Sequence, residues 1–138
     1  MSATLAYIAG LIDGEGYISA SKNSRTKGSY TIVLSISMCR REGVDLCARA
    51  FGGKAREKKR KTITGRSVYI WTIHSKTAEK ALTKLLPFLR VRNRVAKLVL
   101  RMQKLIHEPT HCVTRLTERE ILKRDRIYKK IKLAILEG

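Results

Sequence analysis

The sequence predicts a mixed α/β domain in which helices cover one face of an antiparallel sheet. Three observations support this fold class: an apolar N-terminal segment with helical spacing of small residues, several segments that alternate apolar and polar residues as half-buried strands do, and helix-ending and helix-capping signals in the second half. At 138 residues the chain has the size of one domain. We predict a single domain over residues 1–138, with a core at about 3–107 and a C-terminal helical extension at about 116–137.

The first half of the chain predicts a helix followed by two strands. Small residues at Ala6, Gly10 and Gly14 recur every four positions, which predicts a helix at about Thr4–Asp13 that a second backbone can approach closely. Two segments then alternate apolar and polar residues, with Ile32 on the apolar face of the second. The predicted strands are Tyr17–Asn23 and Tyr30–Met38.

The second half predicts further strands and helices with local stop signals. Consecutive glycines end the next helix, prolines end the two after it, and a Thr-x-x-Glu capping box opens the last. The predicted helices are Val44–Phe51, Lys76–Leu86, Asn93–His107 and about Thr117–Leu136. Two ragged strands are predicted within Lys54–Arg66, and a further strand at Val68–Ile73.

The charge of the chain favours a nucleic-acid partner. Lys and Arg number 30 against 11 Asp and Glu, which gives a formal net charge of +19 and predicts a polyanionic partner. No apolar run reaches the ~20 residues that span a bilayer, and the apolar start lacks the basic region of a signal peptide. Three cysteines without a CxxC pair favour reduced thiols. We therefore expect a soluble intracellular protein, in the cytoplasm or an organelle matrix.

Two acids, Asp13 and Glu15, stand out from the rest. They end the first predicted helix, where the helix dipole disfavours negative charge, and a bound cation would remove this conflict. The other acids cap helices or stand among cations. No Ser-His-Asp or Cys-His arrangement follows from the spacing, so metal-assisted hydrolysis is the reaction class that this inventory allows.

The segment Ile8–Gly16, which reads IAGLIDGEG, resembles the signature of the LAGLIDADG homing endonucleases, with Glu15 in place of the more usual aspartate. The resemblance implies an αββαββα core with a saddle-shaped antiparallel sheet, a motif helix that forms the subunit interface, and a metal-binding second acid. It assigns the metal to Glu15 and a backbone carbonyl near Gly14. Oxygen ligands of this kind suit Mg²⁺, and Ca²⁺ or Mn²⁺ can substitute in binding.

A single copy of the motif implies that two chains pair, because cutting two strands needs two sites. The resemblance thus implies a homodimeric, Mg²⁺-dependent endodeoxyribonuclease that hydrolyses both strands of a long pseudo-palindromic double-stranded DNA target, with no membrane or small-molecule partner. Enzymes of this kind are encoded by introns or inteins. Two alternatives remain: an RNA maturase or non-cleaving nucleic-acid-binding protein of the same fold, and a ribosome-associated basic protein.

The candidate residues follow from the motif, the polar strand faces and the basic segments. Where the family commonly has a glutamine and a lysine, this chain has Arg40 or Arg41 and, in the Arg90–Arg94 region, Arg92. Arginine is not a general base, so plain phosphate binding stays an alternative for them. The expected catalytic residues are Glu15, Asp13, Arg40 and Arg92, and the expected interface residues are Ala6, Ala9, Gly10 and Asp13. The expected DNA contacts are Ser19, Ser21, Asn23, Arg25, Lys27, Thr31, Ser35, Ser37, Arg56, Lys58, Arg60, Arg66 and Arg90.

Overall fold

The computed structural model describes residues 2–23, 28–59, 67–107 and 117–137, which form one four-stranded sheet and its covering helices. The elements are α1 (Ser2–Glu15), β1 (Gly16–Lys22), β2 (Tyr30–Met38), α2 (Arg41–Phe51), β3 (Ala55–Lys59), β4 (Ser67–His74), α3 (Ser75–Leu85), the 3₁₀ turn η1 (Leu86–Phe88), α4 (Asn93–His107) and α5 (Glu118–Glu137). The sheet is antiparallel, in the order β1-β2-β4-β3. The predicted fold class and element order are confirmed.

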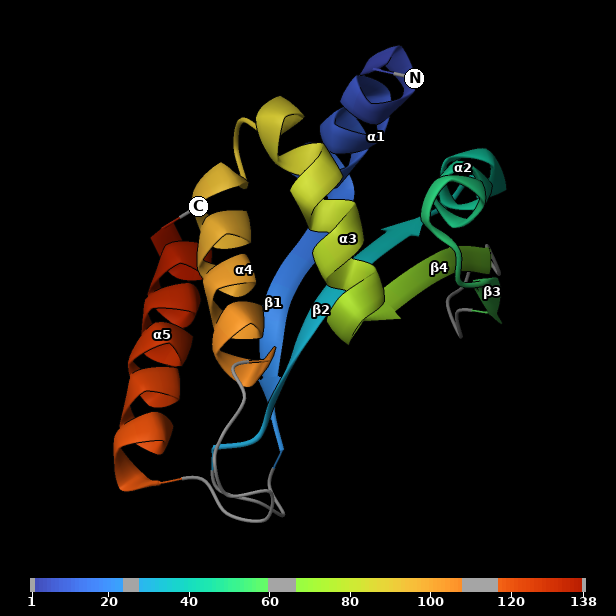
Figure 1. Cartoon of the computed structure of the whole chain (residues 1–138). Coiled ribbons are helices and arrows are strands. Elements are labelled where there is room, and N and C mark those ends of the chain that lie inside the picture. The colour runs from blue at the N-terminus through green and yellow to red at the C-terminus, as the bar shows by residue number, and fades with distance from the viewer. Residues whose placement is uncertain (1, 24–27, 60–66, 108–116, 138) are drawn as a thin grey trace.

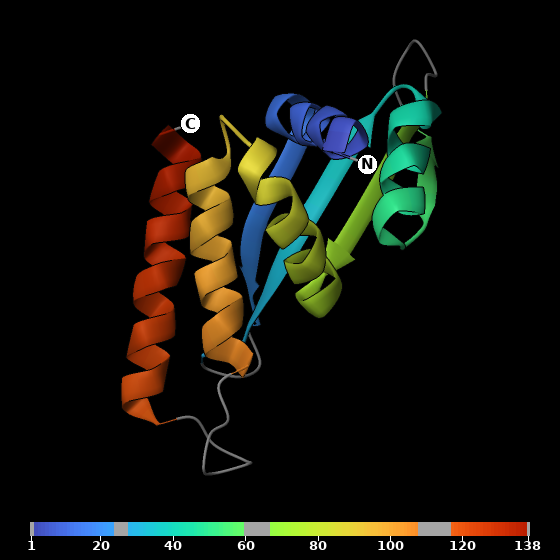
Figure 2. The same ribbon diagram turned by 45° about the horizontal axis from the view of Figure 1, so that its top comes forward.

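The helices cover one face of the sheet and leave the other open. Figure 1 and Figure 2 show α1 to α4 over the same face, with α5 beside α4 at the β1 side. Strand β2 explains this arrangement: Ile32, Leu34 and Ile36 are buried while the residues between them are half-buried or exposed. Because side chains alternate along a strand, the apolar set lies under the helices and the polar set on the open face.

The core lies between the sheet and the helices, and Trp71 links strand β4 to the end of helix α2. The Trp71 side chain is fully buried on β4, and its indole N–H donates to the carbonyl of Gly52 at 2.8 Å, just beyond the end of α2. Burial also raises the pKa of the Cys47 thiol to about 11, so this free cysteine is a neutral core side chain. None of the described helices combines the length and apolar character that a bilayer span requires.

Helix α3 lies one residue earlier than predicted, α1 begins two residues earlier, and three further differences involve Gly16, Arg41 and Pro87. Helix α1 extends to Glu15 because Gly16, rather than the first acid, ends it. Helix α2 begins at Arg41, three residues earlier than expected. Helix α3 ends at Leu85, and Pro87 lies inside the 3₁₀ turn η1 that follows, because proline is tolerated at the start of a helical turn.

Other predicted boundaries agree with the structure. Helix α4 has the predicted bounds. The capping box at the start of α5 is confirmed: the Glu120 backbone N–H donates to Thr117 Oγ1 at 3.2 Å, and the Thr117 N–H donates to Glu120 Oε2 at 3.3 Å. Of the ragged strands expected within Lys54–Arg66, β3 is described, and residues 60–66 lie outside the described part of the chain.

The α1–β1 junction generates a prediction about Gly16, where the chain passes from helix to strand without a loop. A Cβ at Gly16 would lie 2.7 Å from the Ile12 carbonyl oxygen, whereas a Cβ at Gly14 has no atom within 4 Å. We expect Gly16→Ala to lower the free energy of unfolding by about 1–3 kcal/mol through overpacking. The control Lys76→Ala truncates an exposed side chain of α3 and should leave this free energy within about 0.5 kcal/mol. Urea unfolding at one protein concentration measures both, and an unchanged midpoint for Gly16→Ala would contradict the tight junction.

Candidate functional site

Glu15 is an exposed carboxylate at the C-terminal end of α1, with β1 beginning at the next residue. The last turn of α1 contains no basic residue, so the negative end of the helix dipole and the carboxylate stand together without a helical counter-charge. The close approach of Gly16 to Ile12 fixes the position of Glu15 between the helix end and β1. The structure thus places Glu15 where a cation from outside the chain can reach it.

A hollow of about 320 Å³ brings Glu15 together with Arg40. Arg40 precedes α2 and is exposed, and among the described residues no ion pair joins it to Glu15. The expected candidates Glu15 and Arg40 therefore share one site without neutralising each other. The hollow is lined by Glu15, Ser37, Met38, Cys39, Arg40 and Val68.

Asp13 has a structural role that the sequence did not reveal. Its two carboxylate oxygens accept hydrogen bonds from the backbone N–H groups of Arg90 at 2.8 Å and Arg92 at 2.9 Å. A third hydrogen bond joins the same two segments: the Arg92 Nε–H donates to the Ile12 carbonyl at 2.9 Å. The expectation that Asp13 stands out from the acids with structural roles is wrong: it ties α1 to the segment that precedes α4.

The same bonds change the interpretation of Arg92. Its guanidinium satisfies a carbonyl at the end of α1, where the last four carbonyls of a helix have no intrahelical partner. A cation at this position also complements the helix dipole. Arg92 is half-buried and engaged within the protomer, so the geometry favours a role in holding the helix end over that of a free catalytic side chain.

One face of α1 is exposed and made of small residues. Ala6, Gly10 and Gly14 are all exposed, and a Cβ at either glycine has no atom within 4 Å. Tyr7 beside them is 60% exposed. The expectation for Ala9 is wrong, because its side chain is completely buried in the protomer core, on the helix face that packs inward. The exposed small-residue face has the shape that allows a second helix to approach closely.

The open face of the sheet carries most of the described residues expected to contact DNA. Ser21, Asn23 and Ser37 are exposed, and Ser35 is half-buried with its hydroxyl 2.9 Å from Thr72 Oγ1. Thr31 is half-buried, and the backbone of Arg90 is held by Asp13 while its side chain is exposed. Four expected contacts lie outside the described residues, namely Arg25, Lys27, Arg60 and Arg66.

The expectation for Ser19 is wrong. Its side chain is only 1% exposed, although strand alternation places it on the open face. Its neighbours there are larger: Tyr17 lies two residues along the strand, and Val33 lies directly across the ladder. A serine between these side chains does not reach the surface, so Ser19 packs rather than contacts a ligand.

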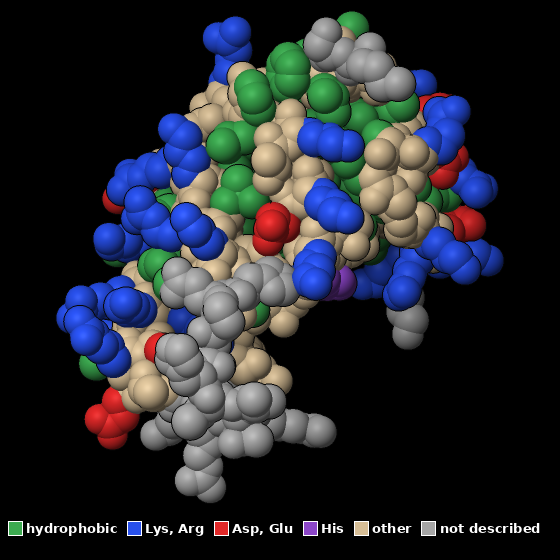
Figure 3. Space-filling model, in the orientation of Figure 1, with side chains coloured by type: hydrophobic (Ala, Val, Ile, Leu, Met, Phe, Trp, Pro, Cys, Tyr) green, Lys and Arg blue, Asp and Glu red, His purple; other side chains and the backbone are tan. Residues whose placement is uncertain are grey.

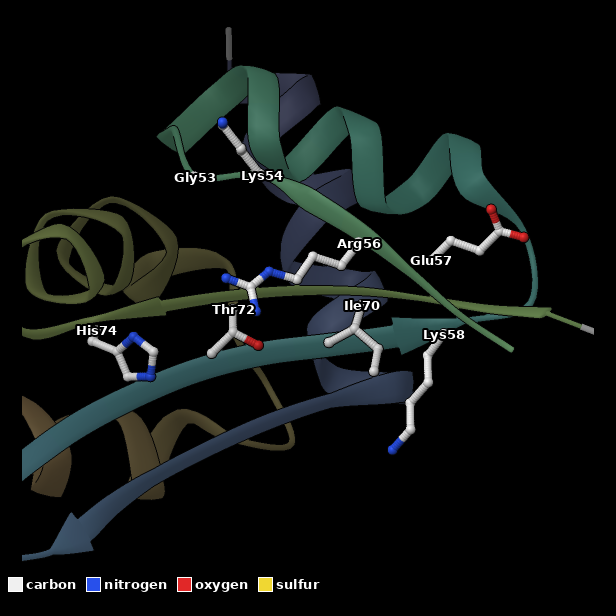
Figure 4. Close-up of a pocket in the computed structure, with 8 residues that line it drawn as sticks. All are labelled: Gly53, Lys54, Arg56, Glu57, Lys58, Ile70, Thr72 and His74. Atoms are coloured by element: carbon white, nitrogen blue, oxygen red, sulfur yellow. The ribbon is translucent and has the colours of Figure 1, made fainter. Parts of the chain in front are cut away.

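A second hollow, of about 690 Å³, lies over β3 and β4 (Figure 4). Figure 4 shows the Arg56 guanidinium extending toward Thr72 and His74, while Lys58 points away from β3 across the neighbouring strands. In Figure 3 the surface is hollowed beneath the sheet, and Lys and Arg side chains lie along the right-hand rim. The residues that line the hollow are Gly53, Lys54, Arg56, Glu57, Lys58, Ile70, Thr72 and His74.

Sequence reasoning missed the contribution of β4 to this face. Ile70, Thr72 and His74 were not among the expected contacts. The signal was present, because Trp71 and Ile73 share one face of the predicted strand Val68–Ile73, and alternation places Ile70, Thr72 and His74 on the opposite face. The open face is therefore continuous from β1 to β3 and mixes hydroxyl, imidazole, aliphatic and cationic side chains.

Comparison with known proteins identifies this arrangement. A family model described as a LAGLIDADG-like domain matches residues 2–86. No curated protein sequence gives a significant match. The structure resembles the archaeal intron-encoded homing endonuclease I-Vdi141I complexed with DNA, with a TM-score of 0.75 and 19% identity over 96% of this chain and 84% of that one.

Two further solved structures share the fold. The homing endonuclease I-CvuI in complex with its target and Ca²⁺ gives a TM-score of 0.72 at 20% identity, over 96% of this chain and 82% of that chain. I-SmaMI, bound to an uncleaved DNA target with calcium ions, gives 0.64 at 24% identity, over 94% of this chain but 45% of that one. At these identities the likeness establishes the fold.

The different surroundings of the two motif acids generate a prediction. We expect Asp13→Asn to lower the free energy of unfolding by about 2 kcal/mol, because an amide N–H₂ replaces one of the two oxygens that accept backbone N–H groups. Glu15→Gln should leave this free energy within about 0.5 kcal/mol, since the carboxylate is exposed. Chemical denaturation compares the two variants, and equal losses of stability would contradict the separation of roles.

Proposed function

Because this chain belongs to the LAGLIDADG family, we propose that it is a homing endonuclease, a homodimer that hydrolyses both strands of a double-stranded DNA target with a divalent metal ion. The observation that carries the proposal is the position of Glu15, which is exposed at the end of α1 directly before the first strand of the open sheet face. In this proposal the target is the insertion site of an intron or intein.

Pairing of two chains follows from the geometry of α1. The motif occurs once in the sequence, while cutting two strands requires two carboxylate sites. Packing of the exposed Ala6, Gly10 and Gly14 face against its copy brings two Glu15 carboxylates to one two-fold axis. A two-fold protein dimer requires a target with approximate two-fold symmetry.

The open sheet face supports duplex DNA as the partner. Exposed hydroxyl and amide side chains can read base edges, and cations such as Arg56 and Lys58 can neutralise phosphates. The formal charge of +19 adds a large electrostatic contribution to DNA affinity, and this contribution does not depend on the DNA sequence. Affinity and base reading thus come from different side chains on the same face.

The residues at the end of α1 fit a hard divalent cation such as Mg²⁺. Glu15 offers a carboxylate, and the Gly14 carbonyl lies in the last helical turn, where carbonyls lack intrahelical partners. Within the described ranges, no group of three or more His, Cys, Asp or Glu side chains could hold a metal. In this proposal DNA phosphates, water and the partner subunit's Glu15 complete the site. When bound, such an ion activates water and neutralises the leaving oxygen.

The other candidate residues either add positive charge beside Glu15 or hold the end of α1 in position. Arg40 presents a permanent cation in the same hollow as Glu15 and suits a phosphate oxygen, because a guanidinium does not accept a proton at ordinary pH. Asp13 and Arg92 hold the helix end in place from inside the protomer. An RNA maturase or a non-cleaving binder would use the same basic face, and it is the exposed Glu15 that favours cleavage.

Cleavage should depend on Glu15. We expect Glu15→Gln to reduce double-strand cleavage at least 100-fold, because the amide keeps the size of the side chain but loses the charge that holds Mg²⁺. Specific binding in Ca²⁺ should survive. The target is a duplex selected from a randomised library by the wild-type protein. The control is Glu42→Gln, which removes an exposed acid from the first turn of α2 and should cut normally. Cleavage by Glu15→Gln near the wild-type rate would refute the assignment.

The dimer interface makes a separate prediction. Gly10→Leu adds a bulky side chain to the exposed face of α1 and should force the two helices apart, which yields monomers in sedimentation velocity. Ala50→Leu adds the same bulk to an exposed position of α2 and should sediment as the wild type does. If Gly10→Leu remains dimeric, α1 is not the interface.

A further inference from the structure

Helix α5 is bonded to the end of the β1–β2 hairpin that lies farthest from Glu15. Arg124 is 8% exposed, and its guanidinium donates to the Gly28 carbonyl at 2.9 Å and to the Leu105 carbonyl at 3.4 Å. Gly28 lies just before β2, and Leu105 lies in the last turns of α4. One buried cation therefore connects α5, α4 and the start of β2.

Tyr30 makes a second connection between β2 and α5. This side chain is 4% exposed, its hydroxyl donates a hydrogen bond to Asp125, and its ring lies 5.0 Å from the ring of Tyr128. Burial and, after it, the bond to Asp125 raise the pKa of Tyr30, so the hydroxyl stays protonated and acts as the donor. The latch, as we name the set of Arg124, Asp125, Tyr128, Gly28 and Tyr30, thus joins consecutive residues of α5 to the beginning of β2.

The latch lies at one end of the sheet and Glu15 at the other. Tyr30 is the first residue of β2 and pairs with Lys22, the last residue of β1, whereas Gly16 at the start of β1 follows Glu15. Seven strand residues at ~3.3 Å each separate the two ends by roughly 20 Å. Figure 1 shows the N-terminal half of α5 at the end of the molecule where β1 ends and β2 begins.

The side chains next to the latch face the open side of the sheet. Thr31 follows Tyr30 directly and pairs with Ser21 across the ladder, and alternation turns both away from the helices. A two-stranded ribbon is marginally stable without support, and readout of base edges requires side chains held to within about 0.5 Å. The orientation of Ser21 and Thr31 therefore depends on what holds Tyr30 from the opposite face.

We propose that Arg124 and Asp125 are positioning residues for DNA specificity: through Gly28 and Tyr30 they hold the hairpin end in the orientation in which it reads the outer base pairs of each half of the target. The proposal rests on the DNA-binding function proposed above. Helix α5 lies beyond residues 2–86, the part of the chain that the family model matches. Specificity at the outer base pairs is thus assigned to a helix that lies on the covered side of the sheet, beside α4.

The test asks how well two variants of the latch discriminate between DNA targets that differ by one base pair. Tyr30→Phe removes only the hydroxyl that Asp125 accepts from, and Arg124→Lys keeps the charge but cannot reach two carbonyls at once. The control is Glu137→Gln, which breaks the exposed 2.9 Å Arg94–Glu137 pair near the other end of α5. Equilibrium binding in Ca²⁺ is measured to the selected duplex and to duplexes with one base pair changed, at a temperature where every variant is folded by circular dichroism.

We expect both latch variants to lose at least threefold in discrimination at the outer base pairs of each half-site and to keep it near the centre, with Glu137→Gln unchanged at both. Unchanged discrimination, or an equal loss at every base pair, would overturn the proposal. Because the readout is binding, a wild-type protein that binds specifically but does not cut refutes only the endonuclease. A protein without base preference refutes both proposals.

Discussion

The close contact between Ile12 and Gly16 is the constraint on which the rest of the structure depends. Because the chain passes from α1 to β1 without a loop, the end of the helix and the start of the sheet are one rigid junction. The exposed helix face, the Glu15 carboxylate and the first open-face side chain, Tyr17, follow one another within a few residues. The proposed interface, the proposed metal ligand and the first side chain of the proposed DNA surface therefore belong to a single continuous segment.

The two acids of this segment have separate roles because of helical geometry. At 3.6 residues per turn, positions two apart lie about 200° apart around the axis, so Asp13 and Glu15 face nearly opposite directions. Asp13 turns toward the protomer and accepts the backbone N–H groups of Arg90 and Arg92, while Glu15 turns to the surface. The Asp13 carboxylate accepts hydrogen bonds that fix the helix end, whereas the Glu15 carboxylate stays exposed, as the proposed metal ligand must be.

Local signals made much of the fold predictable. Alternation identified β2, the capping box located α5, and the small-residue spacing identified the helix α1, although not its end at Glu15. Two of the failures share one cause, which is contact between residues distant in sequence. Ser19 is buried opposite Val33 of the neighbouring strand, and the partners of Asp13 lie 77 and 79 residues away. Ala9 could not be assigned to the inner or outer face, because an apolar helix has no polar side to mark the surface.

The sheet separates chemistry from recognition by distance. Glu15 stands at one end of the β1–β2 hairpin, and the bonds of Arg124 and Tyr30 to other elements stand at the other. Both ends are held by charged groups that bond to backbone or hydroxyl partners inside the protomer: Asp13 and Arg92 at the first, Arg124 and Asp125 at the second. Because these bonds anchor the hairpin from its covered face, exposed side chains of the open face such as Ser21 and Ser37 take no part in the anchoring. In the proposed function, such short polar side chains can then vary with the DNA target without loss of the fold.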